Sequence, residues 1–147
     1  TIFNPAPAVE FPDSVYPLCD YFTPNETEAA DLAGIPVTNV DEAREAAKIF
    51  RDRGVKTALI TLGEMGCYFM NESGEGHVPA FDMSGKVVET TGAGDGFNGG
   101  FAAALAEGKS PDEAIRYGSA TAAISVTRLG TAPAMPQRSE IEQLVNS

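Results

Sequence analysis

Residues 89–97 read ETTGAGDGF, a strand-like run that leads into a glycine-rich turn and then into a helix. Glycine lets the backbone turn tightly and point its N–H groups outward, and a helix N-terminus favours negative charge. Asp95 stands in the first turn of the expected helix, where its carboxylate can accept a proton from an attacking hydroxyl. The stretch therefore predicts a site for a phosphate or a transferring phosphoryl group. It is also compatible with a structural turn in which Asp95 only stabilises the helix start.

The segments around this stretch alternate between strand-like and helix-like patterns, which is typical of α/β proteins with a parallel or mixed sheet and helices on its faces. Thr23, followed by Pro24 and Glu26, is the expected N-cap of one helix, and Ser110 is the expected N-cap of another. We expect helices at 24–33, 39–53, from 92–94 to 108, 111–129 and 138–145, and a helical turn at 13–18. We expect strands at 1–4, 20–22, 55–61, 67–70, 77–81 and 86–89.

The composition is that of a globular chain with a strong negative charge. Its 147 residues include 21 acidic and 10 basic side chains, for a net charge of −11. Because nucleic acids and anionic membranes are bound by positive surfaces, we expect neither as a partner. An acidic protein binds a polyanion such as ATP locally, through backbone N–H groups, helix N-termini or a metal ion. We expect one domain over residues 1–147 and no membrane-spanning segment.

The chain contains two cysteines and one histidine. Cys19 and Cys67 lie in apolar surroundings without the spacing of a metal or redox motif, so we expect reduced core thiols and a cytoplasmic protein. His77 has no second His or Cys at ligand spacing, and we expect it at the surface.

Residues 94–99 also match the GxGxxG pattern of dinucleotide-binding proteins, which raises the alternative of a nicotinamide-dependent oxidoreductase. That fold also needs an acidic residue about 20 residues further on, at the end of the next strand. Asp112 and Glu113 belong instead to the helix start that follows Ser110. No GxxxxGK[ST] motif is present, which excludes a P-loop nucleotidase. A non-catalytic nucleotide-binding module is a further alternative.

The run TGAGDGF at 91–97 resembles the C-terminal signature of the ribokinase, or PfkB, carbohydrate kinase family. The segments NPAP at 4–7, TPNETE at 23–28 and TLGEMG at 61–66 resemble segments of the same family in the same order. The resemblance covers essentially the whole chain. It implies a three-layer, Rossmann-like α/β fold and identifies residues 1–147 as the C-terminal, nucleotide-binding half, without the N-terminal half and lid that supply most sugar-binding residues. It further implies ATP and Mg²⁺, a small sugar as substrate, and a homodimer of the full-length protein.

Individual residues match the family's catalytic elements. Asp95 matches the base that takes the proton of the sugar hydroxyl. The backbone N–H groups of three residues match the anion hole for the transferring phosphoryl group: Gly92, Ala93 and Gly94. The resemblance implies ATP and Mg²⁺ contacts for a second set: Asn25, Glu28, Thr61, Gly63, Gly66, Gly94 and Ser119. From the residues alone, five members of this set also have structural readings. Asn25 and Glu28 are ordinary first-turn polar residues, Gly63 and Gly66 are hairpin glycines, and Ser119 is a small residue for close helix packing.

The family also binds a monovalent cation such as K⁺ beside the anion hole, mostly through backbone carbonyls. The matching positions are Glu89, Thr91, Ser125, Arg128, Gly130 and Ala134. Glu89 departs from the family pattern, which has Asp as a side-chain ligand at that position.

Overall fold

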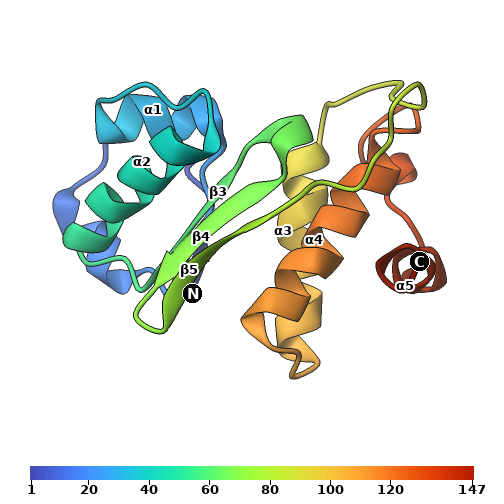
Figure 1. The fold of residues 1–147 in the computed structure, drawn as a ribbon. Coiled ribbons are helices and arrows are strands. Elements are labelled where there is room, and N and C mark those ends of the chain that lie inside the picture. The colour runs from blue at the N-terminus through green and yellow to red at the C-terminus, as the bar shows by residue number, and fades with distance from the viewer. The chain divides into compact units, whose positions relative to one another are not determined.

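A five-stranded mixed sheet runs through the first part of the chain (Figure 1). The strands are β1 (Ile2–Phe3), β2 (Tyr21–Phe22), β3 (Thr57–Thr61), β4 (Cys67–Asn71) and β5 (Gly74–Val78), and they neighbour one another in that order. β1, β2 and β3 are parallel, whereas β4 and β5 pair antiparallel. The computed structural model describes all residues, 1–147, and divides into two units, residues 1–79 and 80–147. The predicted α/β class is confirmed.

The central strand β3 is buried from Thr57 to Ile60, as an apolar run in the middle of a sheet requires. Two helices cover one face of the sheet in this unit, α1 (Glu26–Ala33) and α2 (Val40–Asp52) (Figure 1). The apolar stripe of α2 is fully buried: Ala43, Ala46, Ala47 and Phe50. The alanines of this stripe let α2 approach the sheet closely.

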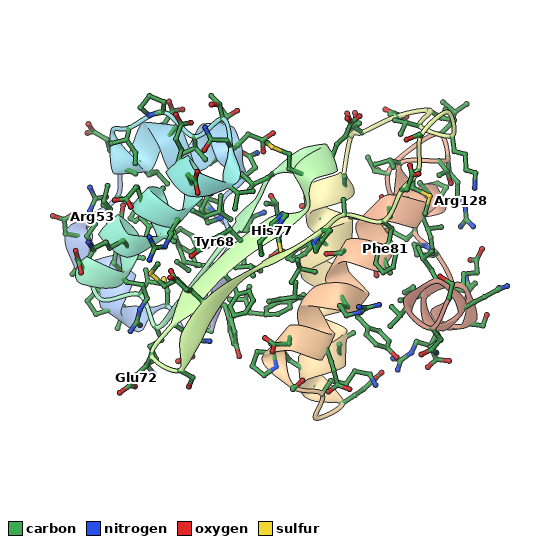
Figure 2. The ribbon with its side chains drawn as sticks, in the orientation of Figure 1. Arg53, Tyr68, Glu72, His77, Phe81 and Arg128 are labelled. Atoms are coloured by element: carbon green, nitrogen blue, oxygen red, sulfur yellow. The ribbon has the colours of Figure 1, made fainter.

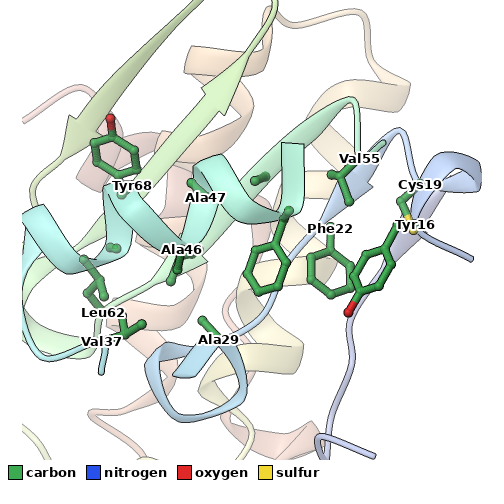
Figure 3. Packing of buried hydrophobic residues seen from close by; sticks show 14 residues of the cluster. Tyr16, Cys19, Phe22, Ala29, Val37, Ala46, Ala47, Val55, Leu62 and Tyr68 are labelled. Carbon is green, nitrogen blue, oxygen red and sulfur yellow. The ribbon is translucent and has the colours of Figure 1, made fainter. Parts of the chain in front are cut away.

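Aromatic rings fill the space between α2, the sheet and the short 3₁₀ helix η1 (Asp13–Leu18) (Figure 3). The ring of Phe22 lies edge-on to those of Tyr16 and Phe50, with centroids 5.5 and 4.9 Å apart. Arg53 covers the cluster, because its guanidinium lies 5.2 Å from the Tyr16 ring centroid and donates to the Tyr16 hydroxyl. The core of this unit is therefore aromatic at one end and alanine-rich at the other.

The predicted start of the first helix was wrong by two residues. The N-cap is Asn25, not Thr23, and the capping box closes with Glu28, not Glu26. The cause is the sheet: the Pro24 carbonyl accepts from the Thr61 N–H at 3.0 Å, and Asn25 forms a parallel bridge with Thr61. This pairing keeps the backbone extended through Asn25, so the helix begins only afterwards.

β4 and β5 form a hairpin, and its second strand lies earlier than expected. We predicted a strand at 77–81, but β5 ends at Val78 and pairs fully with β4, from Asn71 opposite Gly74 to Cys67 opposite Val78. The predicted strand at 86–89 was also wrong. The N–H groups of Val88 and Glu89 both donate to the carbonyl of Val126, at 2.7 and 3.2 Å. This segment therefore bonds to the C-terminal end of α4 and does not pair with a strand.

The second unit, residues 80–147, consists of helices and loops. α3 (Ala93–Ala106) and α4 (Pro111–Ser125) pack side by side (Figure 1), and η3 (Ala132–Ala134) and α5 (Arg138–Val145) follow. The predicted capping box of Ser110 and Glu113 and the bounds of α5 are confirmed, but α4 ends at Ser125 and not at 129. A Cβ on Gly118 would lie 2.8 Å from the Phe97 carbonyl oxygen, so α3 and α4 meet where only glycine fits.

Both cysteines are buried free thiols, as predicted. Burial raises the pKa of Cys67 to about 12 and also raises that of Cys19. None of the helices combines the length and the apolar character needed to cross a membrane.

Candidate active site

The turn that opens α3 leaves backbone donors free. Gly92 is the N-cap with φ 81° and ψ 1°, a left-handed conformation that favours glycine, and a Cβ there would lie 3.3 Å from Thr131 Cγ2. The Ala93 N–H donates to the Thr90 carbonyl at 3.2 Å, whereas the N–H groups of Gly94 and Asp95 donate to no group of the protein. Such unpaired N–H groups at a helix start are what an anion binds.

The predicted anion hole of Gly92, Ala93 and Gly94 stays a prediction, and the structure shows which N–H groups at this turn have acceptors in the protein. Ala93 already has an intramolecular acceptor, and the N–H of Asp95, which sequence reasoning missed, joins that of Gly94 as a free donor. The signal was available in principle: once Gly92 is the N-cap, the next three residues occupy the positions whose N–H groups lack helical partners.

Asp95 offers a carboxylate beside these donors. Its side chain is exposed and accepts no hydrogen bond from the protein. A Cβ built on the neighbouring Gly94 would meet nothing within 4 Å, so the approach to this turn is open. The start of α3 therefore combines a free proton acceptor with free N–H donors, the two kinds of group that phosphoryl transfer to a hydroxyl requires.

Asn98 lies one turn further along α3 and contacts the same turn. Its side-chain Nδ2 donates to the Gly94 carbonyl at 2.9 Å. No sequence motif pointed to this residue, because a side chain that bonds back to the carbonyl four residues earlier leaves no periodic signal.

The side chain of Glu89, in the segment before this turn, forms a hydrogen bond with the loop after α4. Its Oε2 accepts from the Gly130 N–H at 2.9 Å. That bond, together with one from the Thr91 hydroxyl, lowers the pKa of the Glu89 carboxyl below its usual value. Three of the positions predicted for a monovalent cation, Glu89, Thr91 and Gly130, are thus brought together, and the carboxylate among them already has two protein donors.

The other predicted cation positions lie on the same loop and at the end of α4. Ser125 is buried, and its hydroxyl donates to the Ala122 carbonyl at 2.8 Å. Arg128 forms an ion pair with Glu140 of α5. Ala134 is buried in η3. Ser119, predicted to contact ATP, is buried on α4 with 9 % of its surface exposed.

In the first unit, the residues predicted to contact ATP and Mg²⁺ gather at the ends of β2 and β3. Asn25 Oδ1 accepts from the Glu28 N–H and Glu28 Oε2 accepts from the Asn25 N–H, both at 2.8 Å. Thr61 bridges to Asn25, and Gly63 follows in the 3₁₀ helix η2 (Gly63–Met65). Parallel strands place binding residues at their carboxyl ends, so this location suits the predicted role.

The loop that contains Gly63 and Gly66 is held by a residue that sequence reasoning left without a role. His77 is exposed, as predicted, but its Nε2 lies 2.5 Å from the Met65 carbonyl oxygen. Figure 2 shows His77 on β5, beside the strand that carries Tyr68. The contact joins β5 to the turn, and its only sequence signal would have been the β4–β5 register.

The GxGxxG match at 94–99 lies within α3 and not in a turn between a strand and a helix. A dinucleotide site needs those glycines in the turn, where the backbone approaches the pyrophosphate. The structure therefore removes the geometric basis of the oxidoreductase alternative.

Comparison with known proteins finds relatives similar to this chain in sequence and in fold. The chain is 45% identical over 139 residues to a ribokinase from Haemophilus influenzae, an alignment covering 95% of this chain and 45% of the relative. The crystal structure of a ribokinase from Thermotoga maritima matches with a TM-score of 0.89 and 41% identity, covering 99% of this chain and 48% of that one. A ribokinase from Arabidopsis thaliana complexed with ribose and ATP matches with a TM-score of 0.85 and 33% identity, covering 92% and 44%.

The chain thus spans about half the length of the relatives it matches. The model of the pfkB family of carbohydrate kinases matches residues 1–138. The open turn at Asp95 and these similarities lead to one assignment: the chain belongs to the pfkB carbohydrate kinase family.

Proposed function

We propose that this chain carries the catalytic base and the nucleotide site of a kinase that transfers the γ-phosphoryl group of ATP to a sugar hydroxyl. The observation that carries the proposal is the start of α3, where the free carboxylate of Asp95 adjoins the unpaired N–H groups of Gly94 and Asp95. Membership of the pfkB family supports it, as does the similarity to a ribokinase complexed with ribose and ATP.

In the proposed reaction, the sugar hydroxyl gives its proton to the Asp95 carboxylate as its oxygen attacks the γ-phosphorus. The bond from that phosphorus to the bridging oxygen breaks, and ADP leaves. Negative charge on the transferring group is stabilised by the N–H groups of Gly94 and Asp95, aided by the positive end of the α3 dipole. The carboxylate and the N–H groups have separate tasks: one activates the acceptor and the others bind the group in transfer.

Mg²⁺ would neutralise charge on the ATP phosphates. Nowhere in the structure do three His, Cys, Asp or Glu side chains gather as a metal site. This fits an ion held largely by phosphates and water, because Mg²⁺ in such sites keeps several waters and takes only one or two carboxylates. Glu28, with one carboxylate oxygen engaged by Asn25, is the side chain we propose to face that ion.

The proposed monovalent cation site fits these residues less well. The Glu89 Oε2 already accepts from the Gly130 N–H at 2.9 Å, and the Thr91 hydroxyl also lowers the pKa of this carboxyl, so the carboxylate already interacts with groups of the protein itself. We therefore propose that the Glu89 to Gly130 bond itself joins the segment before α3 to the loop after α4.

The rest of the protein's activity follows from the same proposal. The acceptor is a small sugar, and most of the residues that select it would lie outside this chain. We further propose a cytoplasmic enzyme that acts as a homodimer.

The direct test replaces the base. In the full-length gene product, Asp95→Ala is expected to lower kcat at least about a hundredfold with little change in ATP affinity, as for loss of a general base. Release of ADP is measured against a panel of sugars, and ATP binding is measured by calorimetry. Asp112→Ala is the matched control, because Asp112 is an exposed carboxylate in the first turn of α4.

Near-normal turnover by Asp95→Ala would contradict the proposal. Binding of ATP by the unmodified protein without turnover of any sugar would favour the non-catalytic nucleotide-binding module instead.

A further inference from the structure

We infer that Asn98 is a positioning residue for phosphoryl transfer, because its side chain sets the direction of the Asp95 N–H. The inference rests on the proposed function and assigns a role to a residue that touches neither substrate. It concerns only the first two turns of α3.

The argument begins with one peptide group. The carbonyl of Gly94 and the N–H of Asp95 belong to the same planar unit, and in a trans peptide they point in opposite directions. Asn98 Nδ2 holds the carbonyl side at 2.9 Å, and the N–H side has no acceptor in the protein. A side chain that fixes the carbonyl therefore also fixes the line along which the N–H points.

The backbone of this turn needs an additional restraint because the turn is rich in glycine. Gly94 and Gly96 flank Asp95, and glycine in a helix leaves the backbone freer to move than alanine does. A Cβ at Gly94 would touch nothing within 4 Å, so packing does not restrain that residue either. The Asn98 amide is the side-chain contact that the structure places on this peptide group.

The direction of the Asp95 N–H matters for stabilising the transition state. Backbone donors stabilise a transferring group only if they are already aimed at the place where charge develops. A donor that is itself part of a hydrogen-bonded chain is also polarised and strengthened, and Asn98 adds such a bond on the carbonyl side of the Asp95 N–H. Loss of the Asn98 amide should therefore weaken transition-state binding more than it weakens ATP binding.

Three substitutions separate this role from a general effect on folding. Asn98→Asp keeps the shape but cannot donate when ionised, and Asn98→Ala removes the group. Asn98→Ser restores a donor, because a hydroxyl can bond to the carbonyl four residues earlier, as Thr121 does to Tyr117 in α4 at 2.8 Å.

The assay uses the full-length gene product. We expect kcat to fall about a hundredfold in Asn98→Asp and about tenfold in Asn98→Ala, and to stay within about threefold of the unmodified protein in Asn98→Ser. KM for ATP and the affinity for ADP alone should change less than about twofold. Affinity for ADP with aluminium fluoride, a mimic of the transferring group, should fall in the same order as kcat.

Asn39→Ala is the matched control, because Asn39 also bonds a backbone group near a helix start, that of α2. It should lower the melting temperature without changing kcat. The inference is overturned if Asn98→Ala and Asn98→Asp keep normal kcat, or if Asn98→Ser loses as much as Asn98→Ala. It is also overturned if the kcat losses merely follow the melting temperatures.

The Asp95→Ala variant distinguishes failure of this inference from failure of the proposed function. If Asp95→Ala abolishes turnover while the Asn98 variants remain normal, the kinase proposal stands and only the positioning role is wrong. If Asp95→Ala itself remains active, the kinase proposal fails first.

Discussion

At the scale of single residues, the glycines around Asp95 have different physical tasks. Gly92 adopts a left-handed conformation and lies against Thr131, so it forms the turn. Gly99 lies inside α3, and a Cβ there would meet nothing within 4 Å. The same residue type is therefore required at one position and replaceable at the other.

Alanine substitutions should separate the two glycines. Gly92→Ala is expected to lower the free energy of unfolding by about 1–3 kcal/mol, because a side chain is strained at positive φ and Thr131 leaves it little room. Gly99→Ala should raise it by up to about 1 kcal/mol, because alanine favours a helix. Urea denaturation of both variants measures the difference, and equal values would contradict it.

The role of a residue could be predicted from the sequence only where it depends on residues close by in the chain. The role proposed for Asp95 and the turn at Gly92 follow from neighbours within a few positions. The contact from His77 to Met65 depends on the β4–β5 register. That from Glu89 to Gly130 joins residues 41 positions apart. The family resemblance had grouped these two residues around a cation, but nothing in the sequence predicted the direct bond between them.

At the scale of elements, the helix ends followed their capping residues. Ser110 caps α4 as expected, because a cap is a bond between residues three apart. The helix expected from residue 39 begins at Val40, with Asn39 as its N-cap. The first helix was misplaced because Thr61, far along the chain, pairs with Pro24 and Asn25. The supposed strand at 86–89 had the composition of a strand but no neighbouring strand to pair with.

The contact between α3 and α4 gives a prediction for elements. Gly118→Ala should lower the free energy of unfolding by about 1–3 kcal/mol, because the new methyl group would lie 2.8 Å from the Phe97 backbone carbonyl and force the helices apart. Thermal unfolding followed by circular dichroism measures the change, with Gly99→Ala in the partner helix as control. A neutral or stabilising effect of Gly118→Ala would show that the two helices separate without cost.

At the scale of the whole molecule, the α/β class and the family were predictable from the order of segments and a few motifs. The division into residues 1–79 and 80–147 was not, because no change in composition marks it. The connecting segment, from Pro79 to Gly92, contains no helix or strand.

Limited trypsin digestion should therefore cut first after Lys86. This residue is exposed in the connecting segment, where the chain can enter a protease site without unwinding an element. Lys56 is paired with Asp20, and Lys109 lies over the Tyr117 ring at 4.6 Å, so both are more restrained. Mass spectrometry of the first fragments identifies the cut, and Lys86→Gln should delay it. An initial cut inside a helix would contradict the prediction.

The reciprocal bonds between Asn25 and Glu28 have a consequence for any ligand at that place. The Glu28 carboxylate that we propose to face Mg²⁺ also stabilises the first turn of α1, because its Oε2 accepts from the Asn25 N–H. The affinity for the ion and the stability of the first turn of α1 are therefore coupled. A substitution that releases Glu28 from Asn25 to bind the ion more tightly also destabilises the start of α1. Any substitution of Glu28 should therefore change ion binding and helix stability together.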